Sequence, residues 1–123
     1  MKAGVFVVAL VALMGCAIPL AYAQPGVIYN YTIHIDFFAY SCSLSITEVS
    51  LYDASGVVMG AGSSPYGGEI AISFTTPAPM SMLTASAVGL ATWSSYSWSV
   101  NGSNSITLGN AGNYWVTVTM NQP

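Results

Sequence analysis

Hydrophobic and polar residues alternate along most of the chain with a period of two rather than 3.6. The clearest case is the segment 27–38. One of its faces carries only apolar or aromatic side chains: Val27, Tyr29, Tyr31, Ile33, Ile35 and Phe37. The other face carries polar ones: Asn30, Thr32, His34 and Asp36. This pattern predicts a long β-strand with one buried face.

Shorter alternating segments follow, separated by turn residues. They predict strands at 44–52, 57–60, 70–75, 81–88, 92–100 and 114–120, and one more between Gly102 and Leu108. A change of phase near Thr47 and Glu48 indicates a β-bulge. Pro77 and Pro79 end the segment 70–75, because proline donates no hydrogen bond to a strand ladder.

Turn residues predict the connections between these strands. In Asp53–Gly56, the aspartate can bond its own backbone and the glycine can supply a positive φ. The Gly- and Ser-rich stretch 60–68 predicts a flexible loop. Asn101–Gly102 is a strong hairpin signal. A two-residue turn there would put Ile106 and Leu108 on the wrong face, so we expect a three-residue loop or a bulge.

These elements predict an all-β fold. About 7–8 short strands, with no credible helix after Gln24, favour an antiparallel sandwich of the Ig-like or jelly-roll type. No linker or internal repeat divides residues 24–123, which are therefore expected to form one domain.

Residues 1–23 have the three parts of a secretory signal peptide. Lys2 gives a positive start, 5–20 is an uncharged apolar run, and Ala21-Tyr22-Ala23 is a small-x-small cleavage motif. Cleavage after Ala23 leaves 123 − 23 = 100 residues. We expect these residues to form an extracellular or cell-surface protein.

Three alternatives for this segment stay open. Residues 3–23 are long enough to span a bilayer as an uncleaved anchor helix, although Pro19 would kink it. Leu13–Cys16 resembles a bacterial lipobox, which would make Cys16 a lipid-bearing first residue. Lys2–Gly4 resembles an archaeal prepilin junction, after which the apolar helix is retained as a filament core. Each alternative also places the body outside the cytoplasm.

The small number of charged residues excludes several classes of binding partner. Only 4% of residues are charged, against about 25% in ordinary soluble domains, and none after Lys2 is Lys or Arg. Without cationic side chains the body cannot neutralise phosphates, so nucleic-acid binding, a P-loop and attraction to anionic lipids are unsupported. We expect contact with a membrane only during export or through an uncleaved N-terminal segment.

No catalytic set of residues is recognisable. His34 and Asp36 are too few for a metal site, since zinc generally takes three or four protein ligands. Glu48 and Glu69 would suit a glycosidase only if their carboxyl groups lay about 5 to 10 Å apart. Cys42, unpaired after cleavage, is interpreted as a small core residue, as the source of an intermolecular bridge or as a reactive thiol. We expect a non-enzymatic protein without cofactor or metal.

Two features suit an exported protein. Asn30-Tyr31-Thr32 and Asn101-Gly102-Ser103 are N-glycosylation sequons, the first on a polar strand face and the second on a predicted turn. The aromatic residues are the other feature. The alternation places Tyr96, Trp98 and Tyr114 inward. It places Trp93 and Trp115 outward, as candidates for a subunit interface or a sugar contact.

Two segments carry a family resemblance. Gly112–Val118 resembles the Gly-x-Tyr-x-Val-x-Val closing strand of secreted immunoglobulin-like domains, although the paired cysteines of antibody domains are missing. Ile46–Asp53 with Ser55–Gly56 resembles strand-and-turn segments of microbial surface proteins. The small, charge-poor and Ser/Thr-rich body also resembles archaeal surface-filament subunits, including bundling pilins of the TasA-like kind. These resemblances imply a role at the cell surface.

We therefore expect a structural subunit of a filament, pilus or surface layer that assembles with copies of itself. Low charge removes the repulsion that keeps copies apart. The segment 27–38 could complete a neighbour's sheet by donor-strand addition, or it could pair within its own sandwich. The alternative function is a monomeric surface adhesion or carbohydrate-binding module that contacts glycans.

Overall fold

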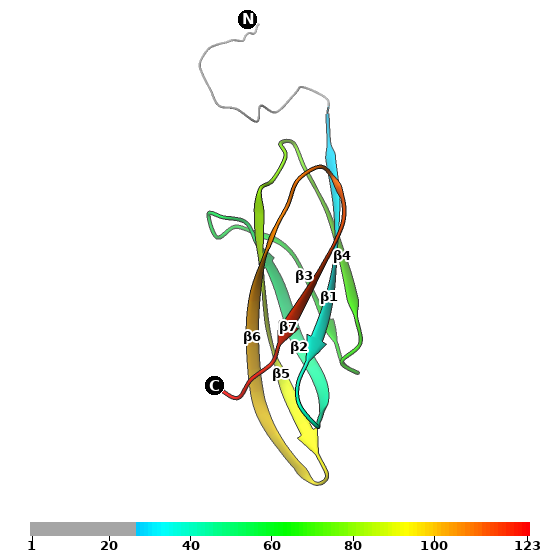
Figure 1. The fold of residues 1–123 in the computed structure, drawn as a ribbon, viewed down its shortest axis with the longest axis vertical. Coiled ribbons are helices and arrows are strands. Elements are labelled where there is room, and N and C mark those ends of the chain that lie inside the picture. Colours follow the sequence, from blue (N-terminus) through cyan, green and yellow to red (C-terminus); the bar gives the residue numbers. More distant parts are fainter. Residues whose placement is uncertain (1–26) are drawn as a thin grey trace, which may run out of the picture.

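The computed structural model describes residues 27–123, which form seven strands and no helix (Figure 1). The strands are β1 (Tyr29–Phe38), β2 (Ser43–Tyr52), β3 (Val58–Ser64), β4 (Ile70–Thr76), β5 (Met82–Trp93), β6 (Tyr96–Thr107) and β7 (Gly112–Thr119). The all-β prediction is confirmed. Residues 1–23 lie outside the described residues, and so do the predicted signal peptide, its cleavage motif and the three alternative interpretations of this segment. Residues 27–123 contain no helix that is long and apolar enough to span a bilayer.

The strands make two sheets, with the orders β4-β1-β7 and β3-β2-β5-β6. Every pair of neighbours is antiparallel except β1 and β7, which run parallel from Tyr31 beside Gly112 to Phe38 beside Thr119. β1 is thus the middle strand of its sheet and is hydrogen-bonded on both sides. The fold is that of a two-layer sandwich.

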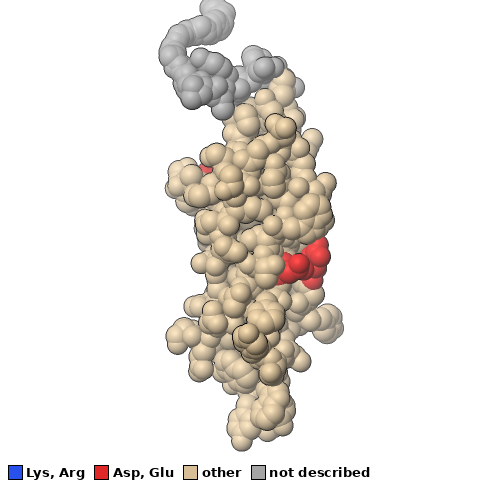
Figure 2. All heavy atoms as spheres, in the orientation of Figure 1, with Lys and Arg blue, Asp and Glu red and all other residues tan. Residues whose placement is uncertain are grey.

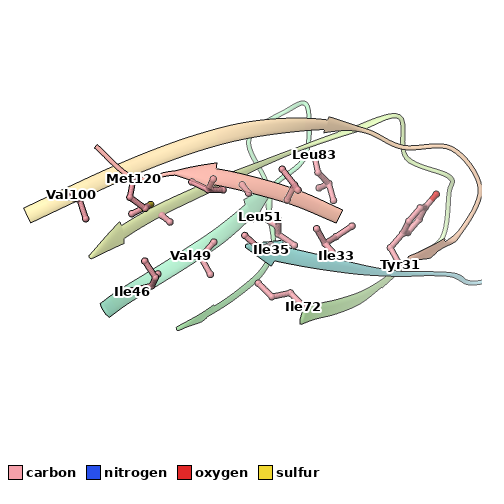
Figure 3. Packing of buried hydrophobic residues seen from close by; sticks show 14 of the residues in the cluster. Tyr31, Ile33, Ile35, Ile46, Val49, Leu51, Ile72, Leu83, Val100 and Met120 are labelled. Atoms are coloured by element: carbon pink, nitrogen blue, oxygen red, sulfur yellow. The ribbon is translucent and has the colours of Figure 1, made fainter. Parts of the chain in front are cut away.

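The core lies between the sheets, where the labelled side chains of Figure 3 point toward one another. The apolar face predicted for β1 is confirmed, because Tyr31, Ile33 and Ile35 have no exposed surface. The inner row of β5 is small by contrast, with Ala85 and Ala87 in it. Ile46, Val49 and Leu51 of the neighbouring strand β2 supply the large side chains of this sheet, and together these residues fill the interior.

Several local predictions are confirmed. The pairing of β2 with β5 shifts register between Ile46 and Glu48, which is the expected bulge. β4 ends at Thr76, directly before the prolines. In the last strand, Val116 and Val118 are buried and Tyr114 is partly buried against the core.

The hairpin predicted at Asn101–Gly102 is wrong. β5 and β6 form one hairpin whose turn is Ser94–Ser95, where Ser94 has the positive φ, 58°, that a tight hairpin turn needs. β6 then runs unbroken through Asn101 and Gly102. A continuous strand keeps Val100 and Ile106 on the core side in one phase, and burial decides the register.

The loop predicted at 60–68 is also wrong in part, because β3 continues to Ser64. Its glycines make room for the neighbouring sheet. A Cβ on Gly60 would lie 2.6 Å from Ile72 Cγ2, and one on Gly62 would lie 2.5 Å from Ile70 Cδ1. Glycine here serves the close approach of two strands rather than a flexible loop.

The two sheets also meet at the opposite seam, between β6 and β7. Asn104 Nδ2 donates a hydrogen bond of 2.9 Å to the Thr117 carbonyl. Asn101 and Asn121 exchange two backbone hydrogen bonds of 2.8 Å. Together with the approach of β3 to β4, these contacts bring the edge strands of one sheet against those of the other.

Candidate functional site

An ordered group of side chains lies on the outer, polar face of β1. His34 Nδ1 is 2.9 Å from Glu69 Oε2, and His34 Nε2 is 3.0 Å from Asn113 Oδ1. The imidazole also stacks on the indole of Trp115, with ring centroids 4.7 Å apart and planes inclined by 10°. We call these four residues the His34 cluster.

The middle position of β1 explains why the cluster forms. His34 pairs with Ala71 of β4 on one side and with Trp115 of β7 on the other. Alternation then turns Asn113 and Trp115 to the same outer face as His34. Glu69 precedes β4 directly, so the cluster joins all three strands of the sheet.

The protonation of His34 determines the hydrogen bonds of the cluster. An imidazolium donates to both the Glu69 carboxylate and the Asn113 carbonyl oxygen. A neutral ring has a single N–H, so one ring nitrogen must accept a hydrogen bond from the Asn113 amide in its flipped orientation. Figure 2 shows an acidic patch on one face of the described residues and no Lys or Arg side chain on that face. Within 27–123, no three His, Cys, Asp or Glu side chains gather as metal ligands.

The predicted assembly strand lies within its own sandwich. Tyr29 and Phe37 are half-buried, and Val27, which precedes β1, is exposed at 36%. The buried Tyr31 hydroxyl donates to the Gly109 carbonyl at 3.1 Å and accepts from the Met80 N–H at 3.1 Å. The apolar face of β1 therefore fills the core and also holds two loops at one end of the sandwich.

The two aromatic residues predicted to face outward lie in different settings. Trp115 is 62% exposed within the His34 cluster, whereas Trp93 is 59% exposed beside the turn of the β5–β6 hairpin. Tyr96 pairs with Trp93, so both side chains lie on the face of the hairpin that Ala91 and Trp98 share, and both are exposed at its tip. The predicted outward position of Trp93 is therefore wrong, and Tyr96 has the predicted inward phase without being buried. Figure 1 shows this hairpin extending past the other strands, so nothing covers its end. Trp98 and Tyr114 are half-buried against the core.

Both sequon asparagines are exposed. Asn30 lies on the outer face of β1, opposite Thr75. Asn101 is not on a turn but in the middle of β6, opposite Val88. It borders an open hollow of about 270 Å³ on the outer face of the larger sheet.

The remaining candidate residues do not come together. Glu48 pairs with the exposed Val88 on the outer face of the larger sheet, whereas Glu69 lies on the outer face of the smaller one. The core separates these carboxylates, and packed sheets lie about 10 Å apart, so they cannot flank one glycosidic bond. Asp36 is exposed on β1, opposite Thr117. Cys42 is a free, half-buried thiol packed against the core.

Sequence reasoning did not predict the His34 cluster. His34 is 35 residues from Glu69 and 79 from Asn113, and no local pattern links them. The available signal was the outward phase of Trp115, which alternation does predict. Comparison with known proteins adds no relative: no family model, curated protein or solved structure matches the chain.

Proposed function

We propose that the chain is a non-enzymatic, extracellular structural subunit that assembles with copies of itself by exchanging β1 between neighbours. We further propose that its sandwich is immunoglobulin-like. The division into sheets of four and three strands has the strand number of a seven-stranded immunoglobulin domain, whereas a jelly roll has eight strands. The strand orders β3-β2-β5-β6 and β4-β1-β7 differ from the ABED and CFG orders of that domain, so the proposed likeness is one of architecture and not of topology.

The position of β1 carries the proposal. β1 separates β4 from β7, and it is joined to the rest of the described chain only through residues 39–42. Removing β1 would open a groove with unpaired backbone on both walls and with the pockets of Tyr31, Ile33 and Ile35 at its floor. An equivalent strand from a neighbour fits that groove with the same pairing.

The seams of the sandwich favour exchange over simple edge addition. A strand that adds to a sheet needs an exposed edge. At β6 and β7 the edges meet through Asn104, Thr117 and Asn121, and at β3 and β4 the glycines bring the strands together. Exchange of β1 requires no free edge, because it replaces one strand by its copy.

Composition supports association outside the cell. Apart from Lys2 the chain has no cation, and four carboxylates are spread over 123 residues, so copies repel one another weakly. Exposed hydroxyl pairs such as Thr32 with Ser73 and Thr84 with Ser105 keep the outer faces hydrated without charge.

A disulfide across β1 and β4 tests the proposal. The Thr32 and Ser73 hydroxyl oxygens are 2.9 Å apart, so T32C/S73C in a Cys42→Ser background should form a cross-strand disulfide. The oxidised variant is expected to stay monomeric by size exclusion and electron microscopy, because β1 cannot leave its own sandwich. Reduction with dithiothreitol should restore assembly.

The matched control is T84C/S105C, which joins β5 to β6 at an oxygen separation of 3.0 Å. It should assemble in both redox states, because exchange of β1 leaves that hairpin intact. If oxidised T32C/S73C assembles as fast as the control, exchange is refuted. If the parent chain forms no assembly at any concentration, the structural role itself is refuted.

A further inference from the structure

The indole of Trp115 is exposed and yet held in one orientation. His34 covers one of its faces by stacking, and His34 is fixed through both ring nitrogens by Glu69 and Asn113. β7 is the edge strand of its sheet, so the other face of the indole looks away from β1 and past that edge. A fixed aromatic face is a site that loses little entropy on binding.

The surroundings of this face are polar and include no Lys or Arg. Asn113 and Thr117 flank Trp115 on the outer face of β7, two residues to either side. The nearby charges, Glu69 and Asp36, are carboxylates. A single indole among hydroxyl and amide groups is a poor surface for an apolar partner, which needs a contiguous hydrophobic patch.

We propose that this face of the β4-β1-β7 sheet binds a neutral saccharide, whose ring stacks on the free face of Trp115. A pyranose offers an apolar C–H face to the indole and hydroxyl groups to the Asn113 amide and the Thr117 hydroxyl. The carboxylates disfavour acidic sugars, since no Lys or Arg compensates for their charge. His34 and Glu69 are positioning residues that hold the indole.

A second aromatic residue extends the site along the sheet. Phe38 pairs with Thr119 on the same outer face and is exposed. Its ring makes a T-shaped contact with that of Tyr40, with ring centroids 5.2 Å apart and planes inclined by 75°. Phe38 lies four residues beyond His34, which is paired with Trp115. Phe38 and Trp115 are therefore separated by roughly 13 Å along the direction of the strands. One sugar ring cannot reach both aromatics, so an oligosaccharide is the expected ligand.

The experiment is a titration of the full chain with cellohexaose, mannohexaose and chitohexaose, followed through the three Trp indole N–H resonances. At least one neutral hexaose should shift the Trp115 resonance saturably, and its monosaccharide should bind more weakly. Trp115→Ala should weaken binding by about tenfold, the equivalent of one lost aromatic contact. Hexagalacturonate, an acidic oligomer of equal length, should not bind.

Trp93→Ala is the matched control, because Trp93 is similarly exposed but has no His34 cluster beside it. It should leave affinity unchanged. The proposal is overturned if no neutral hexaose shifts the Trp115 resonance, or if Trp93→Ala weakens binding as much as Trp115→Ala. It is also overturned if the resonance shifts with protein concentration alone, which would assign the face to a second copy. The result is independent of the β1 exchange test.

Discussion

Two segments of the chain carry the same kind of turn signal, and only one of them is a turn. Asp53–Gly56 and Asn101–Gly102 each place a small polar residue before a glycine. The first segment connects β2 to β3, whereas the second lies inside β6. The comparison separates two uses of glycine, one conformational and one steric.

At Asp53–Gly56 the turn is stabilised locally. One Asp53 carboxylate oxygen accepts hydrogen bonds from the Ser55 N–H at 2.9 Å, the Ser55 hydroxyl at 3.0 Å and the Val57 N–H at 2.9 Å. Gly56 has a φ of 87°, which L side chains rarely adopt, and no neighbour lies within 4 Å of where its Cβ would be. Everything that this turn needs is within five residues of sequence.

At Asn101–Gly102 the glycine serves a distant strand. Gly102 pairs with Ala87, and a Cβ built on it would collide with the Thr119 carbonyl oxygen of β7. Asn101 bonds the backbone of Asn121. The signal is the same in sequence, but here the residue is small because another backbone passes over it.

Gly102→Ala should have the largest effect, because the colliding atom is backbone and cannot rotate away. We expect a loss of about 1–3 kcal/mol in the free energy of unfolding, measured by urea denaturation. Gly68→Ala is the control, since a Cβ there meets nothing within 4 Å and its φ is not positive. Equal losses at Gly102 and Gly68 would show that the seam between β6 and β7 is not closely packed.

Gly56→Ala should cost less, about 1 kcal/mol, since only the left-handed backbone conformation is penalised. Asparagine tolerates that conformation, so Gly56→Asn should recover part of the loss. The recovery is the informative measurement, again by urea denaturation. At Gly102 the larger Asn side chain should lower the free energy of unfolding more than Ala does. Asn should therefore be the more stable variant at position 56 and the less stable one at position 102. If Ala and Asn rank in the same order at both positions, the two glycines do not differ in the way that we infer.

This contrast also marks how far sequence reasoning reaches. The period-two pattern predicted the all-β class, the buried face of β1 and the bulge in β2, because these depend on residues close together in the chain. It failed at Gly60 and Gly102, where the reason for the glycine is a strand from the other sheet. A single sequence has no local mark that distinguishes a turn glycine from one that accommodates a crossing backbone.

The candidate site follows the same rule. The outward position of Trp115 could be predicted from alternation within β7. That His34 stacks on it could not, because the parallel pairing of β1 with β7 brings together residues about 80 apart in sequence. Glu69 and Asn113 meet His34 only once β4, β1 and β7 are in register.

The smallest expected effect tests the charge of the local turn. Hydrogen bonds to its carboxylate hold the pKa of Asp53 below the ordinary value of 3.8. The bond from the Val57 N–H has the largest effect, and those from the Ser55 hydroxyl and N–H have smaller ones. A lowered folded pKa means that this contribution to stability is complete above the unfolded pKa and is lost as the pH falls through the folded one. The effect is small, because Asp53 is exposed to solvent and its charge is screened.

Asp53→Asn keeps the accepting oxygen and removes the charge, so it isolates the contribution of the charge to the free energy of unfolding. The difference in unfolding free energy between the parent and Asp53→Asn should be constant near neutral pH and should shrink as the pH falls below about 4. Asp36, Glu48 and Glu69 are present in both proteins, so their contributions cancel in the difference. If the difference does not depend on pH, the carboxylate charge adds nothing to the stability of the turn. The turn at Asp53–Gly56 would then be stabilised by its hydrogen bonds and by the backbone conformation of Gly56 alone.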